Sequence, residues 1–245
     1  MLRKLSADFV VVFIFLSVLF SISYGYAFFD QNSSDESIGI NIGEWIYEEI
    51  KNLRFLFANE KLDDFLFTSI WHESKDGFRS GFGLLYVENP FDEYTIVARA
   101  VLGIEQSNQS VAGGFGILFE TSIDEKLLDT GYVLQVDRGY GGIVIRPRTS
   151  GNEGSIIIAI TNQQNKYIPV SKRDPFWTEE KSVTIQIKPV DLSKTQKFVN
   201  VWIDDVLIIE DLIIISSTEH QNNFTGFRSW NTVTEYRELE IIPSG

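Results

Sequence analysis

The sequence contains no cysteine among its 245 residues, and it has only two histidines, one methionine and six prolines. Without cysteine the chain can form no disulfide, no thiolate metal site and no thiol nucleophile. The histidines, His72 and His220, are far apart and stand in no zinc-binding spacing. Nothing around them favours a Ser-His-Asp triad. A phosphate-binding loop of the form G-x-x-x-x-G-K-[ST] is also missing.

Positive charge is scarce as well. The chain has 21 Lys and Arg residues against 34 Asp and Glu, which gives a net charge of −13. The acidic residues are scattered, and the basic residues do not cluster. Nucleic acids and anionic membranes require clustered cations. We therefore expect neither of them as a partner.

The N-terminus has the layout of a secretory signal peptide. Arg3 and Lys4 precede an apolar run from Phe9 to Phe20, and small residues follow up to Ala27. This predicts a signal peptide over 1–27 with cleavage between Ala27 and Phe28. The apolar run is short compared with the roughly 20 residues that cross a bilayer. An uncleaved anchor stays the alternative, and membrane contact is expected only through that segment.

The exit from this segment resembles that of a group of exported bacterial proteins. Ala27, Phe29 and Asp30 match an "A-x-F-x-D" pattern, and "IGINIGEW" follows at Ile38. Both are similar to camelysin and TasA-type biofilm-matrix proteins, which a signal peptidase of the SipW class processes. The resemblance implies an extracellular location, secreted or at the cell surface.

The remaining chain predicts a flexible lead over 28–43 and one β-rich domain over 44–245. Apolar residues at helical spacing predict a short helix within Glu44–Phe57. After it, short β-forming runs alternate with turn signals and show almost no helical period. The fold class is therefore all-β, an antiparallel β-sandwich. The expected strands include "EYTIVARAVLGI", "GGFGILFETS", "GYVLQVD", "GGIVIRPR", "SIIIAITN", "KSVTIQIKPV" and two strands around Asp204-Asp205.

The order of these strands resembles concanavalin A-like lectin/glucanase domains of the laminin G-like and keto-disaccharide hydrolase-like branch. The resemblance rests on "VWIDD" at Val201, where Asp205 replaces the usual Gly, "GFRSW" at Gly226 and "YRELEI" at Tyr236. It covers roughly residues 80–243. It implies a jelly roll of two sheets with a surface for sugars, and some members of this fold carry calcium.

Four residues are the candidate ligand contacts: Trp230, Arg228, Asp137 and Arg146. The stretch "VDRGYGGIVI" favours a hairpin whose glycines form the tip. Asp137 or Arg146 on its strands can face a sugar. Of the five tryptophans, Trp230 is the best candidate for partial exposure, with Arg228 two residues earlier on the same strand face. Trp202, by contrast, alternates with Val201 and Ile203, and we expect it in the core.

A catalytic signature is missing. Glycoside hydrolysis needs two carboxyl groups across the bond, and laminarinase-type members of this fold carry "E-x-D-x-E" on one strand. The stretch "ETSIDE" has Glu120 and Asp124 but Ser at the middle position, and it favours acids in a loop. No cofactor is predicted, although a calcium ion at loops such as "IDDV" or "SIDEK" stays an alternative.

Three functions therefore stay open. The first and preferred one is a non-catalytic carbohydrate-binding module with a glycan or polysaccharide as partner. The second is a matrix or filament-associated protein that self-associates through an edge strand. The third is a sugar hydrolase of the keto-disaccharide hydrolase-like branch. We therefore expect no enzyme activity, with this hydrolase as the remaining alternative.

Overall fold

Strands dominate the computed structural model, which describes residues 53–103, 112–190, 195–216 and 223–244. Within these ranges there are 14 strands and two short 3-10 helices, η1 and η2. All strand pairs are antiparallel. The elements are β1 (Leu53–Leu56), η1 (Leu62–Asp64), β2 (Leu66–Ser74), β3 (Gly77–Glu88), β4 (Tyr94–Leu102), β5 (Gly114–Ile123), β6 (Asp129–Asp137), β7 (Gly142–Thr149), β8 (Asn152–Glu153), β9 (Ile158–Thr161), η2 (Pro175–Trp177), β10 (Glu180–Pro189), β11 (Gln196–Ile203), β12 (Val206–Ile215), β13 (Phe224–Trp230) and β14 (Thr234–Pro243).

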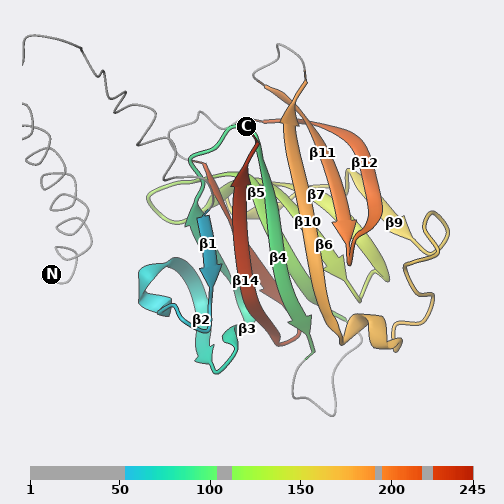
Figure 1. Ribbon diagram of the computed structural model, residues 1–245, viewed down its shortest axis with the longest axis horizontal. Helices are drawn as coiled ribbons and strands as arrows, with labels where there is room; N and C mark the ends of the chain where they lie inside the picture. Colours follow the sequence, from blue (N-terminus) through green and yellow to red (C-terminus); the bar gives the residue numbers. More distant parts are fainter. Residues whose placement is uncertain (1–52, 104–111, 191–194, 217–222, 245) are drawn as a thin grey trace, which may run out of the picture. The chain divides into compact units, whose positions relative to one another are not determined.

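The predicted sandwich is confirmed, and its two layers are halves of one curled sheet. Hydrogen bonding runs in the order β12-β11-β10-β4-β14-β3-β13-β5-β6-β7-β8, with β1 beside β14, β2 beside β3 and β9 beside β7. In Figure 1, β10, β11, β4 and β14 lie in front, and β5, β6 and β7 lie behind them. Strands far apart in the sequence, such as β4 and β10, are neighbours.

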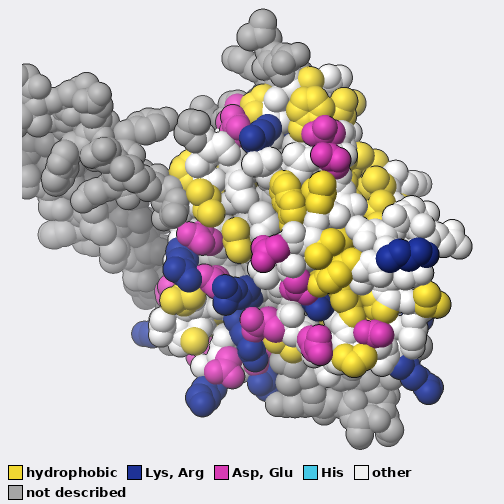
Figure 2. Space-filling model, turned by 45° about the vertical axis from the view of Figure 1, so that its right-hand side comes forward, with side chains coloured by type: hydrophobic (Ala, Val, Ile, Leu, Met, Phe, Trp, Pro, Cys, Tyr) yellow, Lys and Arg dark blue, Asp and Glu magenta, His cyan; other side chains and the backbone are white. Residues whose placement is uncertain are grey.

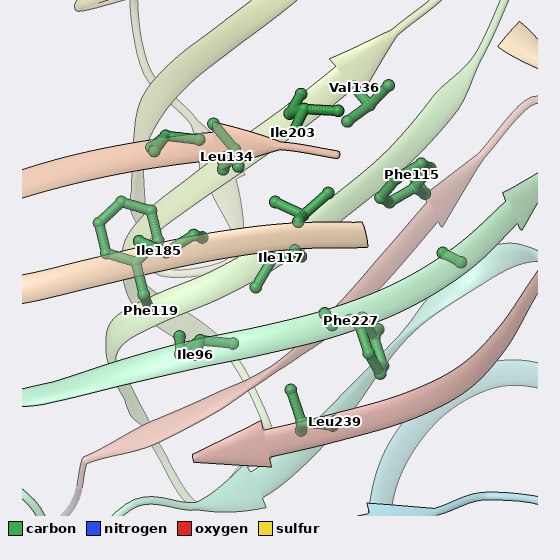
Figure 3. Packing of buried hydrophobic residues seen from close by; sticks show 14 of the residues in the cluster. Ile96, Phe115, Ile117, Phe119, Leu134, Val136, Ile185, Ile203, Phe227 and Leu239 are labelled. Atoms are coloured by element: carbon green, nitrogen blue, oxygen red, sulfur yellow. The ribbon is translucent and has the colours of Figure 1, made fainter. Parts of the chain in front are cut away.

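The core lies between the two layers. Ile185 and Ile203 from one layer and Phe119 and Leu134 from the other point into the same space (Figure 3). All four are at most 1 % exposed. Burying one such side chain stabilises the fold by about 1.5–3 kcal/mol. A core of this size needs no disulfide, which agrees with the lack of cysteine.

Strand β10 shows how the sequence produces this layering. Val183, Ile185 and Ile187 are buried, whereas Ser182, Thr184 and Gln186 between them are half-buried on the outer face. Side chains alternate between the two faces of a strand, so this pattern follows directly from the apolar–polar alternation. The predicted turn at Asp204-Asp205 is also confirmed. Both residues have positive φ, 48° and 65°, as a two-residue hairpin turn requires.

The helix predicted over Glu44–Phe57 is wrong for its last turn. Residues Leu53–Leu56 form strand β1, which pairs with β14 from Leu53 opposite Ile241 to Leu56 opposite Glu238. Phe57 follows it and is buried against Phe78 and Phe227. The apolar residues at helical spacing therefore form a strand, because the backbone of β14 supplies hydrogen-bond partners for the backbone of this segment. Residues 44–52 lie outside the described ranges.

The expectation that Trp202 belongs to the core is also wrong. Its neighbours Val201 and Ile203 are buried, so Trp202 points to the outer face of β11, where it is half-buried. There it lies opposite Thr184 of β10 and Leu207 of β12. Figure 2, which brings the β11–β12 side forward, shows apolar side chains interspersed with acidic and basic ones.

Strand β12 stands at one end of the sheet order and, among the described strands, pairs only with β11. Its apolar residues Ile213 and Ile215 are 51 % and 65 % exposed. Both ends of its backbone are nevertheless capped by side chains. Asn165 Nδ2 donates to the carbonyl oxygen of Leu207 at 3.1 Å, and Tyr132 Oη donates to that of Ile215 at 2.7 Å.

The described residues all belong to one compact unit that spans residues 50–245. The boundaries predicted at 27 and 43, and the cleavage position between Ala27 and Phe28, lie outside the described ranges and stay predictions. Within the described ranges, no helix has the length and apolar character needed to span a bilayer.

Candidate functional site

The four predicted contact residues lie on one face of one layer. Arg228 and Trp230 are on β13, Asp137 ends β6, and Arg146 is on β7. On the same strands, alternating residues such as Phe227, Leu134 and Ile145 point into the core. The four side chains therefore point outward. We call this outer surface of β3, β13, β5, β6 and β7 the Trp230 face.

The strand register brings these residues into neighbouring rows. Trp230 pairs with Gly114 of β5, and Gly114 pairs with Asp137 of β6. One step along, Arg228 pairs with Gly116, and Gly116 pairs with Gln135. Each row thus spans two inter-strand spacings, about 10 Å. The middle position of both rows is a glycine.

These glycines form a low floor under the aromatic and basic side chains. A Cβ atom on Gly114 would lie 2.8 Å from the Cζ2 atom of Trp230, so the indole ring rests directly on the backbone. The guanidinium carbon of Arg228 lies 4.8 Å from the centre of the Trp230 ring. Glycine is found within strands where another group approaches the backbone closely. Gly114 is such a glycine, since the Trp230 ring approaches its backbone.

Glu153 of β8 joins this cluster and was not among the predicted residues. Its carboxylate accepts hydrogen bonds from Arg228 Nη1 and, at 2.5 Å, from Gln135 Nε2. Its second oxygen lies 3.6 Å from Arg146 Nη1. One carboxylate thus holds two arginines in place. The signal in the sequence is "TSGNEG", a Gly-containing hairpin that carries an acid back over the preceding strand.

The charges at the cluster are only partly solvated. The side chains of Arg228 and Arg146 are 16 % and 24 % exposed. Burial lowers the pKa of Arg228, although nearby Glu153 opposes that shift. The Nε atom of Arg146 is buried and, within the described chain, has no hydrogen-bond partner. That N–H group is therefore an unsatisfied donor enclosed by the protein in this conformation.

Asp137 is a candidate ligand contact and also stabilises the hairpin between β6 and β7. Its Oδ1 atom accepts a hydrogen bond from the backbone N–H of Tyr140 at 2.8 Å, which closes the hairpin between β6 and β7. Burial raises the pKa of its carboxyl group, and Arg146 and the hairpin hydrogen bonds oppose that rise. Arg138 turns elsewhere and donates to the carbonyl oxygen of Lys172. The stretch is a hairpin, and Gln135, Asp137 and Arg146 on its two strands connect it with the cluster.

Glu120 does not lie in a loop, contrary to the prediction. It belongs to β5 at a β-bulge, has φ of 48° and is fully buried. Tyr94 Oη donates to its carboxylate at 2.8 Å, and Lys197 Nζ lies 3.0 Å away. A carboxylate enclosed in this way is a structural ion pair in this conformation and is not exposed to a substrate.

In each of the two loops considered for calcium, one acid is held by internal hydrogen bonds. Asp204 accepts from Lys181 Nζ at 2.8 Å, from Tyr167 Oη at 2.5 Å and from the N–H of Ser182. The lysine, the tyrosine and the N–H group lower its pKa against the effect of burial. Asp124 Oδ1 accepts from two backbone N–H groups of its own turn. In the described part of the chain, no group of three or more metal-binding side chains is present.

Comparison with known proteins finds relatives only at the level of structure. No family model matches the chain, and no curated protein matches it. The exoplasmic/lumenal domain of VIP36 is similar in its metal-free form, with a TM-score of 0.53, 8 % identity, and 80 % of this chain and 92 % of that chain covered. Its Ca2+/Man-bound form gives a TM-score of 0.52 at 9 % identity, and the match covers 79 % of this chain and 90 % of that chain.

A third similar structure is the carbohydrate-binding module CBM66 from Bacillus subtilis. It has a TM-score of 0.48 and 14 % identity, and the match covers 71 % of this chain and 94 % of that chain. The VIP36 comparisons show that the chain has a lectin-like jelly-roll fold. Fold alone does not determine a ligand.

Proposed function

We propose that the chain is a non-catalytic carbohydrate-binding module, secreted or at the cell surface, that holds a glycan on the Trp230 face. One observation carries the proposal: a half-buried indole on a glycine floor lies beside two arginines held by one carboxylate. The part of the indole that stays exposed beside Arg228 gives a sugar an apolar contact, and the forked donors of arginine bind its hydroxyl groups.

Two further observations support this proposal. VIP36, which shares the fold, is described in a Man-bound form. Glu120, one of the acids considered for glycoside hydrolysis, is fully buried and paired with Lys197. The export signal and its resemblance to biofilm-matrix proteins provide the location in this proposal, outside the cell.

Binding to a panel of neutral and acidic polysaccharides tests the proposal directly. The chain, recovered after export from a secreting host, is titrated by calorimetry with and without calcium. We expect saturable binding that Trp230→Ala weakens about tenfold, which corresponds to about 1.4 kcal/mol. The matched control is Trp202→Ala, because Trp202 is a half-buried tryptophan on the outer face of the other layer.

Equal losses for the two variants, or no binding to any polysaccharide, would contradict the proposal. The matrix alternative is favoured by one feature, the apolar and exposed edge strand β12. Sedimentation of the same sample separates the two functions. Oligomers that grow with protein concentration and an absence of glycan binding would support a matrix protein.

A further inference from the structure

An open hollow lies next to the Trp230 face, between the β2–β3 hairpin and the turn that follows β13. Its volume is about 610 Å3, and it is lined by residues that include Ile70, His72, Phe82 and Val233. Most of this lining is apolar, and none of these residues was among the sequence-based candidates. The hollow was therefore not predicted from the sequence.

The two largest apolar side chains of the hollow are strongly exposed. Ile70 is 70 % exposed and Phe82 is 65 % exposed, and the two residues pair across β2 and β3. Single exposed apolar residues are common on protein surfaces, but neighbouring ones in a concavity mark binding sites. A ligand with an apolar group would cover both.

The hollow continues the row that contains Trp230. The ladder between β13 and β3 ends at Ser229 opposite Gly83, and Trp230 and Phe82 are the next residues on the two strands. The row then runs from Ile70 through Phe82, Trp230 and Gly114 to Asp137. Its length is four inter-strand spacings, about 19 Å. A linear oligosaccharide that lies along this row contacts the arginine cluster and the hollow at the same time.

We propose that the hollow receives acetyl groups of an acetylated polysaccharide that binds along the Trp230 face. An acetyl group has a methyl group, which can lie against Ile70 and Phe82, and a carbonyl oxygen, which accepts a hydrogen bond. The exposed His72 stands at the rim as a donor. This inference rests on the proposed function, since it names the class of glycan that the same face binds.

The test compares one polysaccharide with and without its acetyl esters. Acetylated glucomannan and acetylated xylan are each titrated beside the same material after mild alkaline de-acetylation, a treatment that leaves the backbone neutral. Oligomers of N-acetylglucosamine form a separate arm, which distinguishes an amide from an ester. We expect the acetylated form of at least one pair to bind about fivefold or more tightly than its de-acetylated form.

Variants assign this preference to the hollow. Phe82→Ser and Ile70→Ser should each remove most of the difference in affinity between the acetylated and the de-acetylated form, because they weaken the acetylated form more than the de-acetylated one. Val170→Ser is the matched control, because Val170 is 81 % exposed and is not among the residues that line the hollow. All three positions lie at the surface, so melting temperatures should stay close to that of the parent.

The possible failures are distinguishable. Equal binding of both forms, with a retained loss for Trp230→Ala, overturns the acetyl inference and leaves the proposed function intact. An acetyl preference that survives Phe82→Ser and Ile70→Ser also overturns it, because the selective contact would then lie elsewhere. Binding to none of the polysaccharides overturns the inference and the proposed function together.

Discussion

The two outer faces of the sandwich each carry a half-buried tryptophan within a strand, but the surroundings of the two rings differ. Trp202 lies opposite Thr184 and Leu207, two ordinary strand residues. Trp230 lies opposite Gly114 and under the guanidinium group of Arg228. The first face is a regular β-surface, whereas the second combines a glycine floor with buried charge.

This difference indicates which of the two outer surfaces is suited to a ligand. A glycine in a strand weakens the strand, and a buried charge costs free energy unless it is paired. Regular pairing needs no such glycine, as the surroundings of Trp202 demonstrate. A paired buried charge occurs on both outer faces, since Glu238 of β14 is buried and held by Arg54 and Arg99. We therefore attribute the glycine floor, together with the donors around it, to the shape that a ligand requires.

The largest expected effect concerns the glycine floor. In Gly114→Ala, the new Cβ would lie 2.2 Å from the carbonyl oxygen of Val136 and 2.8 Å from the Trp230 ring. Backbone and indole must both move, and we expect a loss of about 1–3 kcal/mol in the free energy of unfolding. Urea denaturation followed by circular dichroism measures it.

Two controls accompany this variant. Gly81→Ala places its Cβ no closer than 3.8 Å to a neighbour, the Cγ2 atom of Val233, and should change stability little. Thr184→Ala, opposite Trp202, should change the free energy of unfolding by no more than about 0.5 kcal/mol. A loss of similar size in all three variants would show that the two outer faces tolerate an added or removed side-chain atom equally well.

A smaller effect is expected from the carboxylate that holds the arginines. Glu153→Gln keeps the size of the side chain but removes the charge that Arg228 and Arg146 share. We expect a loss of about 1 kcal/mol in stability and a weaker dependence of stability on salt. The control is Glu180→Gln, whose partner Arg237 lies 2.6 Å away with both side chains more than a third exposed. That variant should have almost no effect.

The smallest effect depends on pH and concerns Asp137. Burial raises the pKa of this carboxyl group in the folded state above that in the unfolded state. The ionised form is therefore penalised on folding, and this cost is present above the folded pKa and disappears as the pH falls below the unfolded pKa. Asp137→Asn should be slightly more stable than the parent at neutral pH.

Thermal melts between pH 3 and pH 8 measure this difference for Asp137→Asn. The advantage of the variant should shrink on acidification. An advantage that is constant with pH would contradict this prediction, because it would show that the charge of Asp137 is not its source.

Much of the fold could be predicted because its signals are local. The alternation in β10 and the Asp204-Asp205 turn depend only on neighbouring residues. The same applies to the shared face of Arg228 and Trp230, two residues apart on β13. Asp137 and Arg146 were placed near a turn by the glycines of their own hairpin.

The errors and omissions concern partners that are distant in the sequence. Leu53–Leu56 form a strand because β14, almost 200 residues later, supplies the pairing edge. Glu120 is buried because Lys197 neutralises it. The roles of Glu153 and Phe82 arise only in the assembled sheet, where Glu153 on β8 reaches Arg228 and β3 lies beside β13. No period or spacing in one segment contains that information.

The capped ends of β12 have a consequence for how fast copies of this chain could join. A strand that adds to this edge would compete with the Asn165 amide at Leu207 and with the Tyr132 hydroxyl at Ile215. Filament growth through β12 would therefore begin with the release of these two side chains. Its time course would show a lag governed by that opening, and a tenfold increase in protein concentration would shorten the lag far less than tenfold.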